Sequence, residues 1–98
     1  MSIKKGQYVI CRTYSAGVFA GILVSREGKE VELKDARRLW LWVGAASLSE
    51  MAMRGTSKPA ECKFPVAVKS ELLTECIELL AVSESARRNI EGVPIWTA

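Results

Sequence analysis

Hydrophobic and polar residues alternate along the first half of the chain, and this pattern predicts β-strands. Two apolar runs occupy residues 8–11 and 18–24, separated by a turn signal at Ser15, Ala16 and Gly17. A second turn signal, residues 26–29 with Gly28, precedes the next alternating run and predicts a hairpin loop. This part of the chain is therefore expected to form antiparallel strands.

Residues 30–43, EVELKDARRLWLWV, form the longest alternating run in the sequence. A period of two places alternate side chains on opposite faces of a sheet. The set expected to face the core is Val31, Leu33, Leu39, Leu41 and Val43, and the opposite set is Glu32, Lys34, Ala36, Arg38, Trp40 and Trp42. Asp35 and Arg37 interrupt the apolar set, so we expect a bulge or bend near them.

Helix signals appear after this run. Ser47 and Glu50 fit a capping box, and Gly55 provides a stop signal, which predicts a short helix between them. Residues 72–81 carry a helix-like apolar stripe, but a new helix start follows them without a breaker, so a strand is favoured there. A second helix is expected over residues 84–91, ending at Gly92. The predicted fold class is α+β, a small antiparallel β-sheet with about two short helices.

The composition supports one folded domain over residues 1–98. Apolar residues make up 49% of the chain and charged residues 26%, which is ordinary for a globular protein. A chain of 98 residues often gains stability from a partner subunit, so a homo-oligomer is expected. The net charge of +3 would favour anions at a local site, but a general nucleic-acid-binding protein is usually more basic.

Several classes of function are disfavoured. The N-terminal residues MSIKKGQYVI lack the apolar core of a signal peptide, and no apolar run reaches the length of a membrane span, so no membrane association is expected. The chain has 3 cysteines, Cys11, Cys62 and Cys76, at wide spacing, which indicates buried thiols rather than a disulfide framework or a zinc site. It has no histidine, which removes the commonest general base and metal ligand. We expect a protein that is not an enzyme and holds no metal or cofactor.

The sequence also suggests where an anion could bind. Arg38 and Trp40 share one face of the predicted strand, where they could form a site for a phosphate and a base or contact another subunit. The segment Gly44-Ala45-Ala46 could either expose backbone N–H groups to an anion or pack tightly between a strand and a helix. Arg87 and Arg88 could bind phosphate or simply lie on a solvated helix face.

Three segments carry a family resemblance: YVICRTYSAGVFAG at residues 8–21, DARRLWLWVGAASLSEMAMRGTSKPAECKF at residues 35–64, and the ending VPIW. Together they resemble the phage Thoeris anti-defence sponge family over nearly the whole chain. The run Ala-Arg-Arg-x-Trp-x-Trp-x-Gly-Ala-Ala-Ser-Leu-Ser is much more specific than a short nucleotide-binding motif. The resemblance implies a non-enzymatic protein in the cytoplasm of the infected bacterial host. It would sequester cyclic nucleotide signalling molecules, namely glyco-cyclic ADP-ribose isomers and, in some members, cyclic di- or trinucleotides of CBASS systems.

The resemblance further implies a dimer or hexamer and a set of binding residues. The expected ligand-binding residues are Arg37, Arg38, Trp40, Lys63, Phe64, Arg87, Arg88 and Asn89. Among these, Arg38 and one of Arg87 or Arg88 are expected to hold phosphate, and Phe64 or Trp40 to stack on the base. A possible second ligand site is Arg12, Ser15, Ala16 and Gly17, where the turn could also be only a hairpin connection.

Two other classes of function fit the same residues. A small phage protein-interaction module would use the tryptophans as hot spots and the arginines at the rim. A regulator that binds single-stranded nucleic acid would place arginines on the backbone phosphates and stack bases on Trp40 or Trp42. Salt dependence of binding and co-purification with a host protein would distinguish them.

Overall fold

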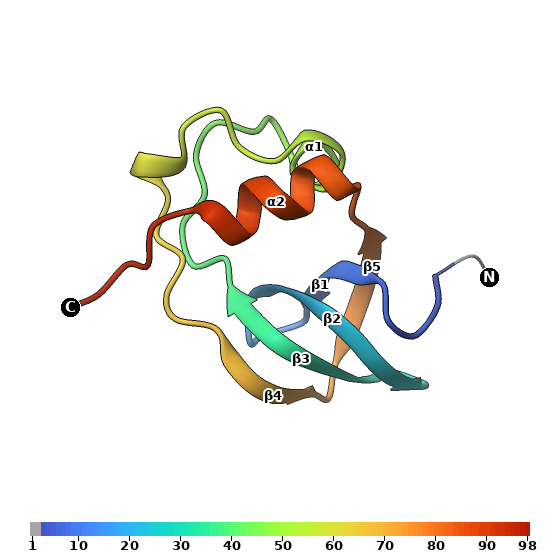
Figure 1. Cartoon of the computed structure of the whole chain (residues 1–98). Helices are drawn as coiled ribbons and strands as arrows, with labels where there is room; N and C mark the ends of the chain where they lie inside the picture. The colour runs from blue at the N-terminus through green and yellow to red at the C-terminus, as the bar shows by residue number, and fades with distance from the viewer. Residues whose placement is uncertain (1–2) are drawn as a thin grey trace.

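The computed structural model describes residues 3–98 as one α+β domain, a five-stranded antiparallel sheet covered on one face by helices (Figure 1). The strands are β1 (Tyr8–Thr13), β2 (Val18–Glu27), β3 (Glu30–Arg38), β4 (Val68–Leu73) and β5 (Cys76–Ala81). The helices are α1 (Leu48–Arg54) and α2 (Glu84–Gly92), with a short 3-10 turn η1 (Pro59–Glu61) between α1 and β4. The predicted fold class is therefore confirmed.

The sheet has the strand order β4-β3-β2-β1-β5, so two strands that are consecutive in sequence lie at opposite edges. Only Thr74 and Glu75 separate β4 from β5, so the sheet must curl until its edges meet at this turn. The turn is tied to both hairpins, because Tyr14 N–H donates to the Glu75 carbonyl (3.0 Å) and Cys76 N–H donates to the Lys29 carbonyl (2.9 Å). The result is a small, partly open barrel.

Two apolar clusters lie on the two faces of this sheet. The inner cluster fills the curl and consists of Val9, Cys11, Phe19, Leu23, Val31, Leu33, Ala36 and Leu73. The outer cluster lies between the sheet and the helices and includes Tyr8, Ile10, Ala20, Leu39, Met51, Phe64 and Ile90. β1 serves both clusters with alternate residues, which explains its nearly continuous apolar sequence.

Both helices begin and end close to the predicted residues. Ser47 Oγ accepts a hydrogen bond from Glu50 N–H (3.3 Å), and the Glu50 carboxylate accepts from Ala46 N–H (2.6 Å), which is a shifted form of the expected capping box. Gly55 ends α1 at φ 78°, a conformation that favours glycine. Ser83 caps α2 in the same way, accepting from Ala86 N–H at 3.1 Å. The predicted helix starts are confirmed.

The predicted bulge in residues 30–43 is confirmed at Asp35, and it changes which residues face the core. Ala20 pairs with Arg37 and Ile22 with Lys34, so Asp35 and Ala36 lie opposite the single residue Gly21. Asp35 has φ 52°, as the first residue of such a bulge requires. Beyond the bulge the alternation reverses, so Ala36 is buried in the inner cluster beside Val31 and Leu33.

The prediction of one continuous strand over residues 30–43 is wrong. β3 ends at Arg38, and the chain then crosses the outer face as an irregular segment that makes an isolated bridge between Leu41 and Lys63. Leu39 is buried as expected, but Leu41 is exposed and Val43 only half-buried. The row of Arg38, Trp40 and Trp42 on one strand face therefore does not form, because the strand ends before the tryptophans.

Residues 72–73 and 76–81 are in β-strands as predicted, but they belong to two strands rather than one. Leu72 and Leu73 end β4, and Cys76 begins β5. The periodicity could not reveal this break, because the turn residues Thr74 and Glu75 include neither glycine nor proline. Among residues 3–98, no helix is long and apolar enough to cross a membrane.

Candidate functional site

One end of the barrel carries a hollow of about 370 Å³ that combines two segments predicted separately from the sequence. The first is the β1–β2 turn, and the second is the end of β3 with the residues that follow it. The lining residues are Ser15, Ala16, Gly17, Val18, Arg38, Leu39, Trp40 and Trp42. The volume lies within the range of roughly 300–1,000 Å³ typical of small-molecule sites. The expected primary residues Arg38 and Trp40 thus lie beside three residues of the expected second site.

The β1–β2 turn is held in a fixed shape by Thr13. Its hydroxyl donates to the Gly17 carbonyl (2.7 Å) and accepts from Ala16 N–H (2.9 Å), while Thr13 N–H also donates to the Gly17 carbonyl at 3.0 Å. Gly17 has φ 111°, where a side chain would be strained. The wall of the hollow that this turn forms is therefore preorganised.

Arg38 lines the hollow, and its positive charge is only partly neutralised. Its Nη1 donates to the Ala16 carbonyl at 2.5 Å, and its Nη2 lies 3.9 Å from a carboxylate oxygen of Glu71 in β4. The guanidinium carbon lies 4.4 Å from the centre of the Phe19 ring. The Arg38 side chain is 40% exposed, so N–H groups remain available to an anion from solvent. These contacts fix the orientation of the guanidinium plane.

A stacked pair of tryptophans lies beside the hollow. The Trp40 and Trp96 rings are 4.9 Å apart between centroids and nearly parallel, at 6°. Lys63 Nζ lies 5.5 Å from the Trp40 ring centre and 5.4 Å from that of Trp96. Trp40 is still 58% exposed. The pair therefore presents a rigid aromatic surface with an adjacent cation.

Two isolated bridges bring the residues of this aromatic surface together. Leu41 pairs with Lys63, and Phe64 pairs with Ile95 in parallel, so three distant segments run side by side. Trp96 N–H donates to the Phe64 carbonyl at 3.0 Å and holds the C-terminal segment in place. Trp96 was not among the site residues predicted from the sequence. Its position after Val93-Pro94 gave no signal that its ring would reach Trp40.

The small residues after Trp42 serve packing. Thr56 Oγ1 donates to the Val43 carbonyl, and Ser57 N–H donates to the Gly44 carbonyl at 3.0 Å. A side chain at Gly44 would meet Lys58 N and Thr56 Oγ1 at 2.6 Å. Ala46 N–H is already bound to the Glu50 carboxylate. Of the two interpretations of Gly44-Ala45-Ala46, the geometry therefore favours tight packing.

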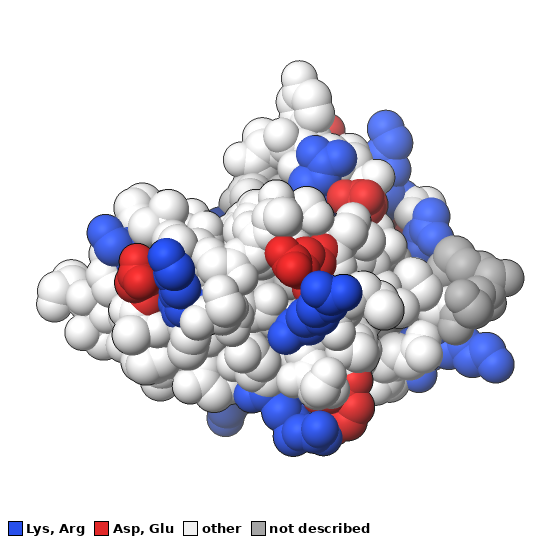
Figure 2. Space-filling model, turned by 90° about the horizontal axis from the view of Figure 1, so that it is seen from above, with Lys and Arg blue, Asp and Glu red and all other residues white. Residues whose placement is uncertain are grey.

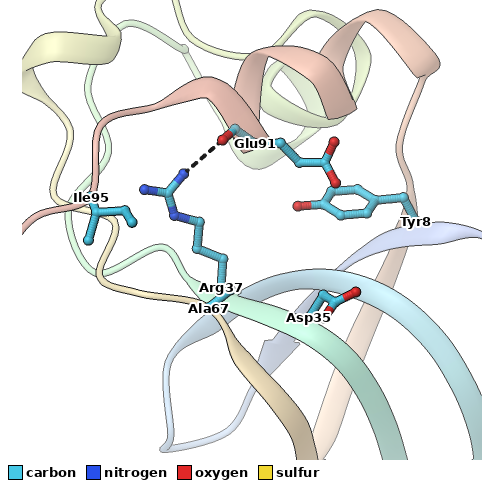
Figure 3. Close-up of a pocket in the computed structure, with 6 residues that line it drawn as sticks. All are labelled: Tyr8, Asp35, Arg37, Ala67, Glu91 and Ile95. Carbon is cyan, nitrogen blue, oxygen red and sulfur yellow. Dashed lines mark hydrogen bonds between the residues drawn. The ribbon is translucent and has the colours of Figure 1, made fainter.

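Arg37 points to the opposite side of the sheet from Arg38 and is buried, with 6% of its surface exposed. Its Nη1 donates to the carbonyls of Ile90 (2.8 Å) and Glu91 (3.5 Å) at the end of α2. Its other donors bind the carbonyls of Pro65 (3.2 Å) and Phe64 (3.0 Å). Figure 3 shows this side chain reaching from β3 to α2. The cation donates hydrogen bonds to carbonyls at a helix C-terminus. This structural role leaves few of its N–H donors for a ligand.

Beside Arg37 lies a second hollow, of about 210 Å³, lined by Tyr8, Asp35, Arg37, Ala67, Glu91 and Ile95 (Figure 3). Tyr8 is 5% exposed, and its hydroxyl points into this space. Burial, with the nearby Glu91 carboxylate as a smaller cause, raises the pKa of Tyr8 to about 12. Burial likewise lowers the pKa of the Arg37 guanidinium from its usual range. Neither side chain appears in the lining of the Arg38 hollow.

The remaining expected residues lie outside the Arg38 hollow. Phe64 is fully buried in the outer cluster, and Asn89 is bound to the backbone of Thr56, accepting from its N–H (2.8 Å) and donating to its carbonyl (3.0 Å). Arg12 pairs with Glu78 across β1 and β5 at 3.1 Å. In this single chain these side chains contact their own fold rather than the hollow.

Arg87 and Arg88 pair with acidic residues of their own helix. Arg87 lies 3.2 Å from Glu91, and Arg88 lies 3.4 Å from Glu84. Figure 2 shows the helix-covered face, where basic and acidic side chains alternate instead of forming one basic field. Such a surface suits solvation rather than binding along a duplex.

The comparisons with known proteins identify a family whose function is unknown. Residues 6–90 match the model of DUF6948, a domain of unknown function. This match covers most of the chain, so the chain belongs to that family. No curated protein and no solved structure matches the chain.

Proposed function

We propose that this member of the DUF6948 family is a non-enzymatic sponge that binds cyclic ADP-ribose-type immune messengers in the Arg38 hollow. The observation that carries the proposal is the junction of the preorganised 15–17 turn with Arg38 and Trp40 at one end of the barrel. The proposal also rests on the resemblance of the sequence to the phage Thoeris anti-defence sponges. The protein would then act in the cytoplasm of the infected bacterial host and block TIR-Thoeris signalling.

The chemistry of the hollow fits such a ligand. A cyclic ADP-ribose isomer offers a pyrophosphate, ribose hydroxyls and a flat base. Arg38 has a fixed guanidinium plane with N–H groups open to solvent, which suits a charge-assisted contact with phosphate. Trp40 has a free ring surface and Lys63 adds a nearby positive charge, which suits the base and the second phosphate. Cyclic di- or trinucleotides of CBASS systems share the same groups.

Sequestration requires binding without turnover, and the side chains around the hollow favour it. The hollow is lined by a serine, an arginine, two tryptophans and apolar residues, with no carboxylate or thiol among them. The chain has no histidine. Ser15 therefore has no general base beside it to make it a nucleophile.

We also infer a homo-oligomer, a dimer or hexamer, assembled through the aromatic surface. The exposed apolar residues there are Trp40, Leu41, Ile95 and Trp96, on the segments that the two bridges and the Trp40–Trp96 stack join. Exposed tryptophans at fixed positions are typical interface hot spots. Because Trp40 belongs to both the surface and the hollow, a second subunit would deepen the hollow and complete the site.

The proposal is tested by native mass spectrometry of the purified protein with glyco-cyclic ADP-ribose. We expect a stable complex of the oligomer, and heating should release the messenger chemically intact. Linear ADP-ribose is the matched control ligand and should bind more weakly. Conversion of the messenger in proportion to protein concentration, or no complex with any cyclic ADP-ribose isomer, would contradict the proposal.

The aromatic surface supports a second candidate, a small phage protein-interaction module. The Trp40–Trp96 stack with Lys63 at its edge could anchor a host protein as well as another subunit. In that case a host protein should co-purify with the chain, and the substitution Trp96→Ala should abolish the association. A regulator of single-stranded nucleic acid would instead show a steep salt dependence of binding to oligonucleotides.

A further inference from the structure

The two cysteines of neighbouring strands β1 and β5 lie against each other inside the barrel. Cys11 Sγ and Cys76 Sγ are 3.1 Å apart, with the Cys11 thiol donating to the Cys76 sulfur, although 65 positions separate them in sequence. Both are free thiols. Sequence spacing alone predicted only buried, unconnected thiols at these positions.

A bulge in β5 brings the two sulfurs together. Arg12 pairs with Glu78 and Thr13 with Cys76, so Ile77 has no partner residue on β1. This extra residue turns Cys76 to the face of the sheet that Cys11 occupies, where it packs against the inner cluster. Without the bulge, Ile77 would oppose Thr13 and Cys76 would point to the other face.

The two thiols differ in their access to solvent. Cys11 is fully buried, whereas Cys76 is partly exposed and lines a surface hollow of about 170 Å³ with Ile3 and residues 77–79. Burial, reinforced by the hydrogen bond to Cys76, raises the pKa of the Cys11 thiol. A reagent from solvent should therefore meet Cys76 first, with Cys11 held behind it as the second sulfur.

We propose that Cys11 and Cys76 form a dithiol modification site that a low-molecular-weight disulfide converts into an intramolecular disulfide joining β1 to β5. The sulfurs need to approach by about 1 Å to reach bonding distance, which small side-chain rotations can provide. The proposal is independent of the messenger-binding function.

The conversion takes two exchange steps. The Cys76 thiolate attacks one sulfur of the small disulfide, so a mixed disulfide forms and the first small thiol leaves. The Cys11 sulfur then attacks Cys76 and displaces the second small thiol, which takes up the Cys11 proton. Two protein thiols lose two electrons and two protons, and one small disulfide becomes two small thiols.

Oxidised glutathione is the probe for the test, with the reduced native protein. We expect the number of free thiols to fall from three to one, the mass to decrease by two hydrogens, and peptide mapping to show a Cys11–Cys76 link. The melting temperature should rise by roughly 10 °C or more, because the bond closes a loop of most of the chain. The third cysteine, Cys62, is buried beside the Thr56 hydroxyl and should stay a thiol.

Two variants give the order of reaction. Cys11→Ser should stop at a mixed disulfide of Cys76 with glutathione, and Cys76→Ser should stay unmodified at Cys11. The conservative control Cys62→Ala should oxidise like the wild type. If wild-type protein forms only mixed disulfides or intermolecular dimers, or keeps all three thiols, the proposal is wrong. This wild-type result decides the matter even if a serine variant fails to fold.

Discussion

Arg38 near the end of β3 donates a hydrogen bond to the carbonyl oxygen of Ala16 in the β1–β2 turn, with 2.5 Å between Nη1 and the oxygen. This contact joins two segments that sequence analysis assigned to separate ligand sites. It also fixes the position of the guanidinium in the lining of the 370 Å³ hollow. The role of Arg38 is therefore the first matter to test.

Replacing Arg38 with alanine should weaken messenger binding by about 2–4 kcal/mol, or roughly 30- to 1,000-fold, because a desolvated phosphate would lose its partner. Lysine should restore only part of this loss, since a point charge cannot reproduce the planar fork. Calorimetric affinity and oligomeric mass are measured on the same samples. Arg54→Ala is the control, because that side chain is 80% exposed on α1. An intact assembly with unchanged affinity would remove Arg38 from the site.

Replacing Trp96 with alanine should break the oligomer while leaving the monomer folded. The substitution removes one ring of the Trp40–Trp96 stack and part of the exposed apolar surface, and leaves the lining of the Arg38 hollow in place. Light scattering reports the mass of the protein at a concentration of about tens of micromolar, which is well above the dissociation constant of a stable interface. Met53→Ala, at an apolar residue that is 65% exposed on α1, is the control. A wild-type protein that is monomeric under these conditions would contradict the inferred assembly.

Replacing Arg37 with alanine should lower the free energy of unfolding by about 3 kcal/mol, because carbonyls of α2 and of residues 64–65 would lose their donor. Arg38→Ala should cost less than about 1 kcal/mol, because Arg38 is partly exposed and its ion pair is long. Urea unfolding of both variants makes the comparison. Equal losses would show that the buried cation does not hold α2 to the sheet.

Tyr8 makes stability depend on alkaline pH. Its pKa is raised from 10.0 in the unfolded chain to about 12 in the folded one, chiefly by burial. The folded state thus holds the proton more tightly, and stability falls as the pH rises from 10 to 12, by about 2–3 kcal/mol in total. Urea unfolding across this range should show a shallower decline for Tyr8→Phe than for the wild type. Equal slopes for Tyr8→Phe and the wild type would refute the assignment.

The helices and strands of this fold can be predicted from local sequence patterns. Where a strand ends depends also on contacts between residues that are distant in the sequence. The caps at Ser47, Gly55 and Ser83 act within one helical turn, so the sequence predicts them well. The end of β3 depends instead on the bulge at Asp35 and on the Leu41–Lys63 bridge, which involve partners far along the chain. Alternation alone cannot reveal either.

The residues that line the Arg38 hollow were singled out in the sequence as separate groups, and their grouping was not predicted. Arg38 and Trp40 were selected for their chemistry, and the Ser15–Gly17 turn for its glycine, yet it is the pairing of β2 with β3, with Phe19 opposite Arg38, that places them together. Arg37 has the same chemistry as its neighbour but lies on the other face, where backbone carbonyls occupy its donors. Neighbouring arginines can thus have opposite environments, and the register after the bulge decides which of the two side chains lines the hollow.

The pairing of β1 with β5 has a consequence for the protein as it leaves the ribosome. β2 and β3 emerge soon after β1, so the first three strands can pair early, while one edge of β1 stays open. That edge carries Val9, Ile10 and Cys11, which are fully buried in the finished fold. Open apolar edges invite pairing with other chains. Chains whose synthesis pauses before residues 76–81 have been made should therefore expose this edge, and we expect chaperones to bind them.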